Sequence, residues 1–154
     1  MRRRDREISS RAEIDAVIHG SLVCRVAMTL EDGPYLVPLS YGYDGQALFF
    51  HTAGAGRKLQ GFEAGGRVCF ELERNVELVE HPRAACEWSF RFESVIGYGT
   101  ISEILDAEEK ENGLNQIMRH YSGRAWELPG GELGRTRVWR LGVDSVSGKR
   151  SVAK

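Results

Sequence analysis

Two adjacent cations, Arg57 and Lys58, follow the small-residue segment 54–56 and could together bind an anion. Glycines let the backbone approach a ligand closely, and charge-assisted hydrogen bonds from two cations could hold a phosphate monoester without a metal. This is not a Walker-type phosphate loop, because Arg57 separates Gly56 from Lys58 and Leu59 stands where that motif needs a hydroxyl residue. A solvated basic pair at a turn is the alternative interpretation.

His51 and Thr52 come just before this basic corner, at the end of an apolar segment. Imidazole titrates near neutral pH, so His51 is the candidate catalytic residue, acting as a proton donor. A structural hydrogen bond, or a cofactor contact without acid–base work, is the alternative. The other histidines are scattered along the chain and lie away from this corner.

A hairpin must position these residues. Residues 35–43 and 47–50 read as strands, and Asp44-Gly45 between them is a strong hairpin signal because both turn positions need positive φ. Pro38 cannot donate a backbone hydrogen bond, so it predicts an edge strand or a bulge. The neighbouring backbone groups of Leu39 and Ser40 would then be free to bind a ligand.

Short strands and a few helices account for the rest of the chain. We expect helices over 10–20, with a capping box formed by Ser10 and Glu13, over 58–63, and over 106–121. Further strands are expected over 22–28, 67–72, 86–92, 94–104 and 136–146. Residues 74–82 read as a loop with some strand character, and the loop over 123–135 is long enough for a lid or an interface contribution. Gly97 and Gly99 would clear room on one strand face for a ring or backbone, or serve barrel curvature. About seven short strands predict a mainly β antiparallel barrel or sandwich with a few helices.

Composition predicts one globular domain spanning residues 1–154, with 42% hydrophobic and 28% charged residues. The net charge of −1 gives no electrostatic footprint for nucleic acid beyond the arginine-rich residues 1–9, which we interpret as a flexible or partner-contacting arm. We find no apolar run of about 18 residues and no secretory signal, so we expect a cytoplasmic protein without a membrane span.

The chain has an odd number of cysteines, namely Cys24, Cys69 and Cys86, and they lack CxxC spacing. Neither a disulfide framework nor a metal site is therefore predicted. Each lies in an apolar or alternating segment. We therefore expect all three to be small buried hydrophobic residues.

Several separated segments resemble, in the right order, the pyridoxamine 5'-phosphate oxidase-related flavoproteins, and most of all their 5-nitroimidazole resistance (Nim-like) group. The segments are MRRRDREI, VCRVAM, YLVPLSYGY, LFFHTAGAGRKLQGF, RVCFEL, SVIGYGTISEI and VWRLGVDSVSGK. Ordered motifs across nearly the whole chain are more specific than any single short motif.

The resemblance implies an antiparallel split β-barrel of Greek-key type that forms a homodimer and binds FMN at the interface. It also implies roles for individual residues. The isoalloxazine ring would lie beside Val37, Pro38, Leu39 and Ser40, and the ring and ribityl chain would meet His51 and Thr52. The phosphate would be bound by Arg57 and Lys58. The flavin would also be approached by Ser94 and Val95, and the partner's site would be reached by Trp139 with Arg140. A core or dimer-interface role is the alternative for Trp139.

The activity that the resemblance implies is electron transfer from reduced flavin to a small electrophile such as a nitroimidazole or another nitroaromatic compound. The strand YLVPLSYGY lacks the basic residues of the RxVLLK-like strand in the oxidase proper, so pyridoxamine phosphate oxidation is not expected. Two alternatives remain open: a non-enzymatic flavin-binding or flavin-storage module, and a relative that binds haem or a deazaflavin in the same fold.

Overall fold

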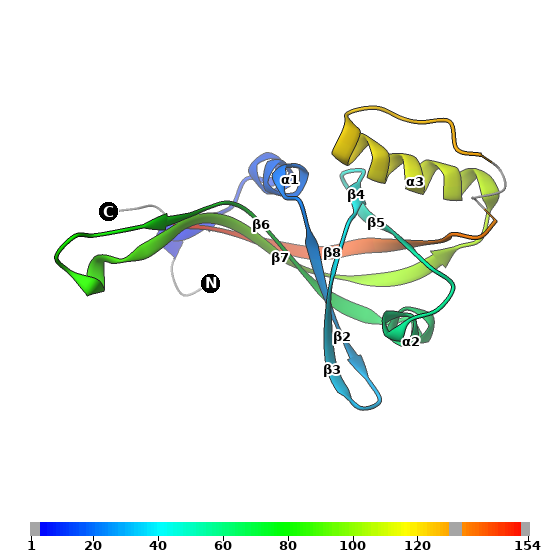
Figure 1. Cartoon of the computed structure of the whole chain (residues 1–154), viewed down its shortest axis with the longest axis horizontal. Coiled ribbons are helices and arrows are strands. Elements are labelled where there is room, and N and C mark those ends of the chain that lie inside the picture. Colours follow the sequence, from blue (N-terminus) through cyan, green and yellow to red (C-terminus); the bar gives the residue numbers. More distant parts are fainter. Residues whose placement is uncertain (1–3, 130–133, 152–154) are drawn as a thin grey trace.

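The computed structural model describes residues 4–129 and 134–151 (Figure 1). The strands are β1 (Glu7–Ile8), β2 (Cys24–Leu30), β3 (Gly33–Leu39), β4 (Gly42–Tyr43), β5 (Ala47–Thr52), β6 (Arg67–Val79), β7 (Ser89–Ile104) and β8 (Arg137–Ser151). The helices are α1 (Arg11–Gly20), α2 (Arg57–Ala64) and α3 (Ala107–Ser122), with short 3-10 turns η1 (Arg4–Arg6) and η2 (Ala85–Glu87). The mainly β prediction is confirmed.

The strands form one antiparallel sheet in the order β3-β2-β6-β7-β8-β5-β4, and β1 pairs with β8. The predicted single strand over 35–43 is wrong, because β3 ends at Leu39 and β4 begins at Gly42, at the opposite end of the sheet. Tyr41 explains the break. Its ring is fully buried, and its hydroxyl donates to the backbone oxygens of Ile18, in the last turn of α1, and of Ser21, just after it; these bonds anchor the chain as it crosses between the two ends.

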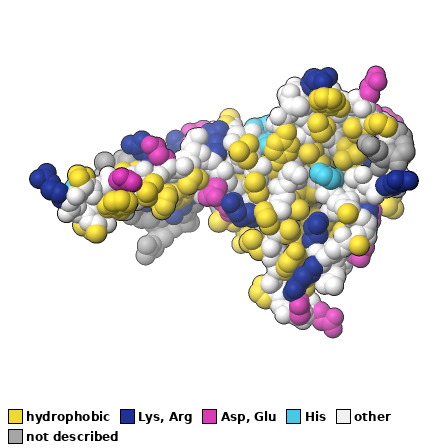
Figure 2. Space-filling view, viewed as in Figure 1, with side chains coloured by type: hydrophobic (Ala, Val, Ile, Leu, Met, Phe, Trp, Pro, Cys, Tyr) yellow, Lys and Arg dark blue, Asp and Glu magenta, His cyan; other side chains and the backbone are white. Residues whose placement is uncertain are grey.

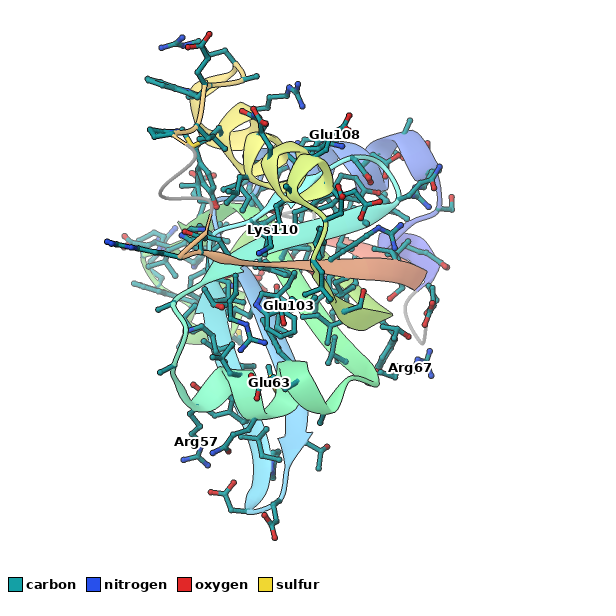
Figure 3. All side chains as sticks on the ribbon, turned by 90° about the vertical axis from the view of Figure 1, so that its right-hand side faces the viewer. Arg57, Glu63, Arg67, Glu103, Glu108 and Lys110 are labelled. Carbon is teal, nitrogen blue, oxygen red and sulfur yellow. The ribbon has the colours of Figure 1, made fainter. Side chains whose placement is uncertain are left out.

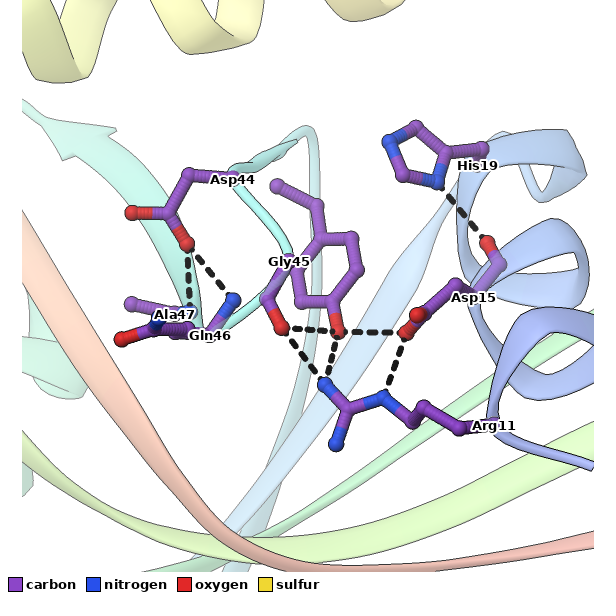
Figure 4. Close-up of polar contacts among 8 residues, drawn as sticks. Arg11, Asp15, His19, Asp44, Gly45, Gln46 and Ala47 are labelled. Carbon is purple, nitrogen blue, oxygen red and sulfur yellow. Dashed lines mark hydrogen bonds and ion pairs between the residues drawn. The ribbon is translucent and has the colours of Figure 1, made fainter.

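The predicted Asp44-Gly45 turn does join β4 to β5 (Figure 4). Gly45 has a φ of 97°, which favours glycine, and Oδ1 of Asp44 accepts hydrogen bonds from the backbone of Gln46 and Ala47 at 2.8 and 2.7 Å. The turn is tied to α1 by side-chain hydrogen bonds among Arg11, Asp15 and Tyr43.

The capping box predicted at the start of α1 does not form. Ser10 is the N-cap residue, but its side chain makes no capping hydrogen bond, and Glu13 instead pairs with Arg150 of β8. The Glu13 carboxylate, which would complete the local cap, therefore forms an ion pair with a residue distant in the sequence. Within the predicted N-terminal arm, Ile8 is buried and pairs with Gly148 through β1.

Beyond the body of the sheet, β6 and β7 extend as a two-stranded arm, residues 75–91 (Figure 1). The loop predicted over 74–82 is wrong for residues 74–79, where β6 continues after an irregularity between Arg74 and Glu77, and is confirmed for residues 80–82. The predicted separate strand over 86–92 is also wrong, because η2 occupies 85–87 and β7 runs unbroken to Ile104. Most side chains of the arm are exposed, so the segment lacks the alternation that marks a half-buried strand.

Internal packing accounts for the paired glycines of β7. A Cβ on Gly97 would collide with the ring of Phe70, and a Cβ on Gly99 would collide with the carbonyl of Gly142. The ring that Gly97 accommodates therefore belongs to the protein's own core.

The cysteines differ in burial. Cys24 is buried as predicted, Cys69 is partly exposed, and the prediction of a buried Cys86 is wrong because η2 lies in the arm, away from the core.

The segment after α3 packs back on that helix. The backbone N–H of Trp126 donates to Oδ1 of Asn115 at 2.7 Å, and the Trp126 indole donates to Ser122. The centre of the predicted lid, residues 130–133, lies outside the described residues. None of the described helices is long and apolar enough to span a membrane.

Candidate functional site

The site is built on the open edge of β3, which within the described residues pairs only with β2. Pro38 lies on this end strand, so the edge position predicted for it is confirmed. Val37 and Leu39 are half-buried, whereas Pro38 and Ser40 are exposed. An end strand leaves part of its backbone N–H and C=O groups without ladder partners, so β3 can offer both donors and acceptors to a flat polar ligand.

The basic corner leads from the end of β5 into α2. Gly56 has φ 141° and ψ 153°, a backbone conformation that is essentially restricted to glycine. The helix is held close to β2, since a Cβ on Gly61 would collide with the Met28 side chain. Its Phe62 packs against Trp139 of β8 at a ring-centre distance of 5.2 Å. These contacts fix the start of α2 beside the β2–β3 hairpin (Figure 3).

Arg57 connects the corner directly to β3. Its Nη2 lies 2.7 Å from Oδ2 of Asp32 in the β2–β3 turn, and its guanidinium carbon lies 5.1 Å from the ring centre of Tyr35. The pair is solvent-exposed, with 53% and 64% of the two side chains accessible. Such an exposed pair can open to admit a stronger anion.

Lys58 occupies the first turn of α2 and is half-buried. Its ammonium lies 3.8 Å from the position that a Cβ on Gly56 would take, so it folds back over the glycine corner. Among the described residues it has no ion-pair partner. The first N–H groups of a helix also lack partners within it, so backbone and side chain together present positive potential at this point.

Two residues of β8 support both sides of the corner. The indole of Trp139 donates to Oγ1 of Thr52 at 3.0 Å, and both side chains are buried. Nε of Arg137 donates to Oε1 of Glu103 at 2.8 Å, and a second arm of its guanidinium binds Glu63 of α2. The hydrogen bond from Arg137 holds the pKa of the Glu103 carboxyl below its usual value. The end of β5 and the helix α2 are thus attached to the same strand.

The remaining predicted residues are divided between the surface and the core. His51 is exposed at the end of β5 and pairs with Val138. Trp139 and Val95 are buried, so their side chains support the site from within the subunit. Ser94 and Val95 lie on β7, three strand positions from β3, which corresponds to roughly 14 Å across the sheet. One subunit therefore does not bring β7 and the edge of β3 together.

Sequence reasoning missed the residues that link the corner to its surroundings: Asp32, Tyr35, Glu63, Glu103 and Arg137. The alternation of Tyr35 with Val37 marks it as a strand residue, and Asp32 is typical of a turn. Neither pattern indicates contact with a helix that starts at residue 57. The ion pairs of Arg137 span 74 and 34 residues, beyond the reach of any local pattern.

Residues 10–150 match the family described as pyridoxamine 5'-phosphate oxidase. The chain belongs to this family. A search of curated proteins gives no match.

Solved structures show the same fold. A candidate 5-nitroimidazole antibiotic resistance protein from Bacteroides thetaiotaomicron is 30% identical, with a TM-score of 0.82 over 94% of this chain and 86% of that one. An FAD- and haem-binding protein from Mycobacterium smegmatis is 22% identical, with a TM-score of 0.82 over 95% and 73% of the two chains. A flavocytochrome from Azotobacter vinelandii is 20% identical, with a TM-score of 0.81 over 99% and 72%. The split-barrel prediction is confirmed.

Proposed function

We propose that this protein binds FMN along the edge of β3, with the phosphate at the start of α2, in a homodimer whose reduced flavin delivers electrons to a small electrophile such as a nitroaromatic compound. The observation that carries the proposal is the position of Arg57 and Lys58. Both cations occupy the first turn of a helix that starts beside the edge of β3, which has no second neighbouring strand in the described part of the chain.

Typical interaction energies favour phosphate over Asp32 as the partner of Arg57. An exposed ion pair such as Arg57–Asp32 contributes about 0–1 kcal/mol. A hydrogen bond to a charged group contributes about 1.5–3 kcal/mol. A phosphate monoester could accept such bonds from Lys58, from Arg57 and from the first N–H groups of α2. The phosphate would therefore displace Asp32 rather than be excluded by it.

The size of the basic site favours a single phosphate. Two adjacent cations suit the monophosphate of FMN better than the diphosphate of FAD. The exposed edge at Pro38 and Ser40 offers polar backbone groups to the ring, and Thr52, held by Trp139, fixes the position of the neighbouring His51. The 30% identical structure described as a candidate 5-nitroimidazole resistance protein supports a nitro compound as electron acceptor.

Bound flavin supplies the electron transfer, and the residues of this chain position the reactants and supply protons. Each stage of nitro-group reduction takes up protons together with electrons. His51 is the proposed donor, because its side chain is exposed at the end of β5 and histidine is the side chain that most often transfers protons in enzyme sites. Backbone groups of β3 would orient the ring, and Lys58 would hold the phosphate end fixed.

The homodimer is supported by the distance between β7 and the β3 edge within one subunit. The family resemblance assigns both Ser94 and the β3 edge to the flavin, although they lie roughly 14 Å apart across the sheet. A site between two subunits would let β7 of one copy approach the β3 edge of the other.

The test is the visible absorption spectrum of the purified protein before and after addition of FMN and desalting. Retained flavin bands are expected. A haem band, or no retained chromophore, would contradict the proposal. Turnover of a nitroimidazole with a chemical or nicotinamide reductant then separates an enzyme from a flavin-storage module, and His51→Ala should retain FMN but lose rate. An unchanged rate in His51→Ala would remove the proton-donor role.

A further inference from the structure

A surface cavity of about 310 Å³ lies where the arm joins the body of the sheet. The α1–β2 connection, the start of β2 and the part of β6 that enters the arm surround it. We call it the arm-root cavity, and its lining includes Leu22, Val23, Arg25, Glu73, Arg74 and Val76. Figure 2 shows positive, negative and apolar side chains close together at this junction. The volume is at the lower end of the range for small-molecule sites, about 300–1,000 Å³, and suits a single small ring.

One side of the arm-root cavity is apolar. Leu22, Val23 and Val76 are 74%, 37% and 53% exposed, although side chains of these types are usually buried. Hydrogen bonds hold the surrounding backbone in place. The Tyr121 hydroxyl donates to the backbone oxygen of Leu22 at 2.8 Å, and Nη1 of Arg74, at the root of the arm, donates to the backbone of α1. The apolar groups are therefore already arranged to contact a ligand ring.

Arg25 forms the polar side of the arm-root cavity. Its Nη1 lies 3.1 Å from Glu71 and its Nη2 lies 3.2 Å from Glu73, so two carboxylates hold the guanidinium in one orientation. The Arg25 side chain is still 38% exposed. A guanidinium has five N–H donors in a planar fork, so further donors remain for a ligand that offers two acceptor oxygens in one plane.

Charge around the arm-root cavity favours a neutral ligand over an anion. Arg25 is shared by Glu71 and Glu73, which leaves one negative charge in excess on the polar side. The charge of Arg74 is balanced by Glu93 at 2.8 Å. A ligand carboxylate would therefore add a like charge beside Glu73, which opposes its binding. A nitro group has the same planar pair of acceptor oxygens but carries no net charge, so it fits the fork without that penalty.

Arg25 also connects the arm-root cavity to the proposed position of the flavin. Arg25 is the cross-strand partner of Pro38 in the β2–β3 ladder. Directly opposite residues share a face of the sheet and lie about 5 Å apart. The basic corner is at the other end of the same hairpin, where Arg57 contacts Asp32 in the turn. A ligand with its phosphate at that corner and its ring beside Pro38 would thus point its ring end toward the cavity.

We propose that the arm-root cavity binds the electron acceptor, a small neutral nitroaromatic compound, with its nitro oxygens on Arg25 and its ring against Leu22, Val23 and Val76. The inference rests on the proposed function, because flavin beside Pro38 is the electron source. It assigns Arg25 as the residue that determines specificity for a nitro group over a carboxylate.

The test titrates nitrobenzene and benzoate into the ¹⁵N-labelled full chain without a reductant and follows the backbone amide signals by NMR. Benzoate has the shape of nitrobenzene and one negative charge. Nitrobenzene should shift the amide signals of Leu22, Val23 and Val76 with a Kd of about 1 mM, as expected for a ligand of this size. Benzoate should bind at least about 5-fold more weakly.

Three variants locate the site and test the role of Arg25. Arg25→Lys keeps the charge but loses the planar fork, so it should weaken nitrobenzene binding about 5-fold to 10-fold and abolish the preference over benzoate. Val76→Phe fills the cavity from an exposed position and should weaken nitrobenzene binding at least about 10-fold. Leu78→Phe, at an exposed position further along the arm and outside the cavity lining, is the matched control and should bind like wild type. Circular dichroism shows that each variant is folded.

Four results would overturn the inference: nitrobenzene shifts located away from the cavity, benzoate that binds as tightly as nitrobenzene, Arg25→Lys that binds like wild type, or equal effects of Val76→Phe and Leu78→Phe. Flavin absorbance is read separately. Protein that retains FMN and reduces nitrobenzene with an unchanged KM in Val76→Phe would support the proposed function and overturn this inference. Nitrobenzene binding in the cavity of protein that retains no flavin would leave the site assigned and would reject the proposed function.

Discussion

The backbone at Gly56 is the most sharply testable feature of the basic corner. Its φ of 141° and ψ of 153° lie in a region that only glycine occupies without strain. Space around it is open, since a Cβ there would find only the Lys58 ammonium, at 3.8 Å. Gly56→Ala should therefore destabilise the protein through backbone strain alone, by about 1–3 kcal/mol. For a chain of this size that corresponds to a fall in melting temperature of roughly 2–12 °C.

Gly54→Ala is the matched control for this substitution. Gly54 lies two residues earlier in the same segment, has no positive φ and has nothing within 4 Å of its added Cβ. It should be neutral or slightly stabilising, because alanine restricts the unfolded chain. Differential scanning calorimetry of the two apo proteins gives the comparison. Equal melting temperatures of Gly56→Ala and Gly54→Ala would refute the argument that the backbone conformation at position 56 requires glycine. FMN affinity should also fall only in Gly56→Ala, since its backbone leads into the first turn of α2.

Other predictions concern residues around the site. Trp139→Phe removes the hydrogen bond to buried Thr52 and part of the ring packing against Phe62. Chemical denaturation should therefore show a free energy of unfolding lower by about 2–4 kcal/mol. A decrease below about 1 kcal/mol would contradict the supporting role of Trp139. Arg137→Gln breaks the ion pairs to Glu63 and Glu103 and should weaken FMN binding, because α2 is then displaced. Arg91→Gln breaks an exposed ion pair on the arm and should leave FMN binding unchanged. Equal effects of the two variants on FMN affinity would refute the role of Arg137 in positioning α2. Burial lowers the pKa of His120, so protonation of this residue favours the unfolded chain. The free energy of unfolding should therefore fall as the pH drops below about 6.5, the ordinary pKa of histidine. Urea titrations at several pH values should show a smaller fall for His120→Gln. An unchanged pH dependence in His120→Gln would contradict this assignment.

Local patterns were sufficient where one segment decides its own structure. Asp44-Gly45 forms its turn because φ at Gly45 and the Asp44 side chain act within four residues. α2 follows the glycine corner as expected, with Leu59 and Phe62 buried. The edge position of Pro38 follows from a missing donor, a property of the residue itself.

Features that depend on distant partners could not be read in this way. Glu13 has the spacing of a capping box, yet Arg150 takes its carboxylate. The strand expected over 35–43 breaks because the hydroxyl of buried Tyr41 donates to backbone oxygens at the end of α1. The sequence predicts a loop over 74–82, although β6 continues to Val79, because a strand that lacks a buried face loses the alternating pattern.

The candidate site was predictable in part for the same reason. Arg57 and Lys58 stand together in the sequence, so their shared charge is visible there. The contact of Arg57 with Tyr35, and the attachment of α2 to Arg137, exist only after the sheet has formed. The position of Ser94 relative to the β3 edge depends on the strand order β3-β2-β6-β7, which no local pattern encodes.

The most direct measurement of the central claim compares the affinities of FMN and riboflavin for wild type and Lys58→Ala by isothermal titration calorimetry. The two ligands differ only in the phosphate. If Lys58 holds the phosphate, Lys58→Ala should weaken FMN binding by about 10-fold to 150-fold, the equivalent of one charge-assisted hydrogen bond, and leave riboflavin binding unchanged. Equal losses for both ligands, or no loss for FMN, would contradict the assignment of the basic corner as the phosphate site.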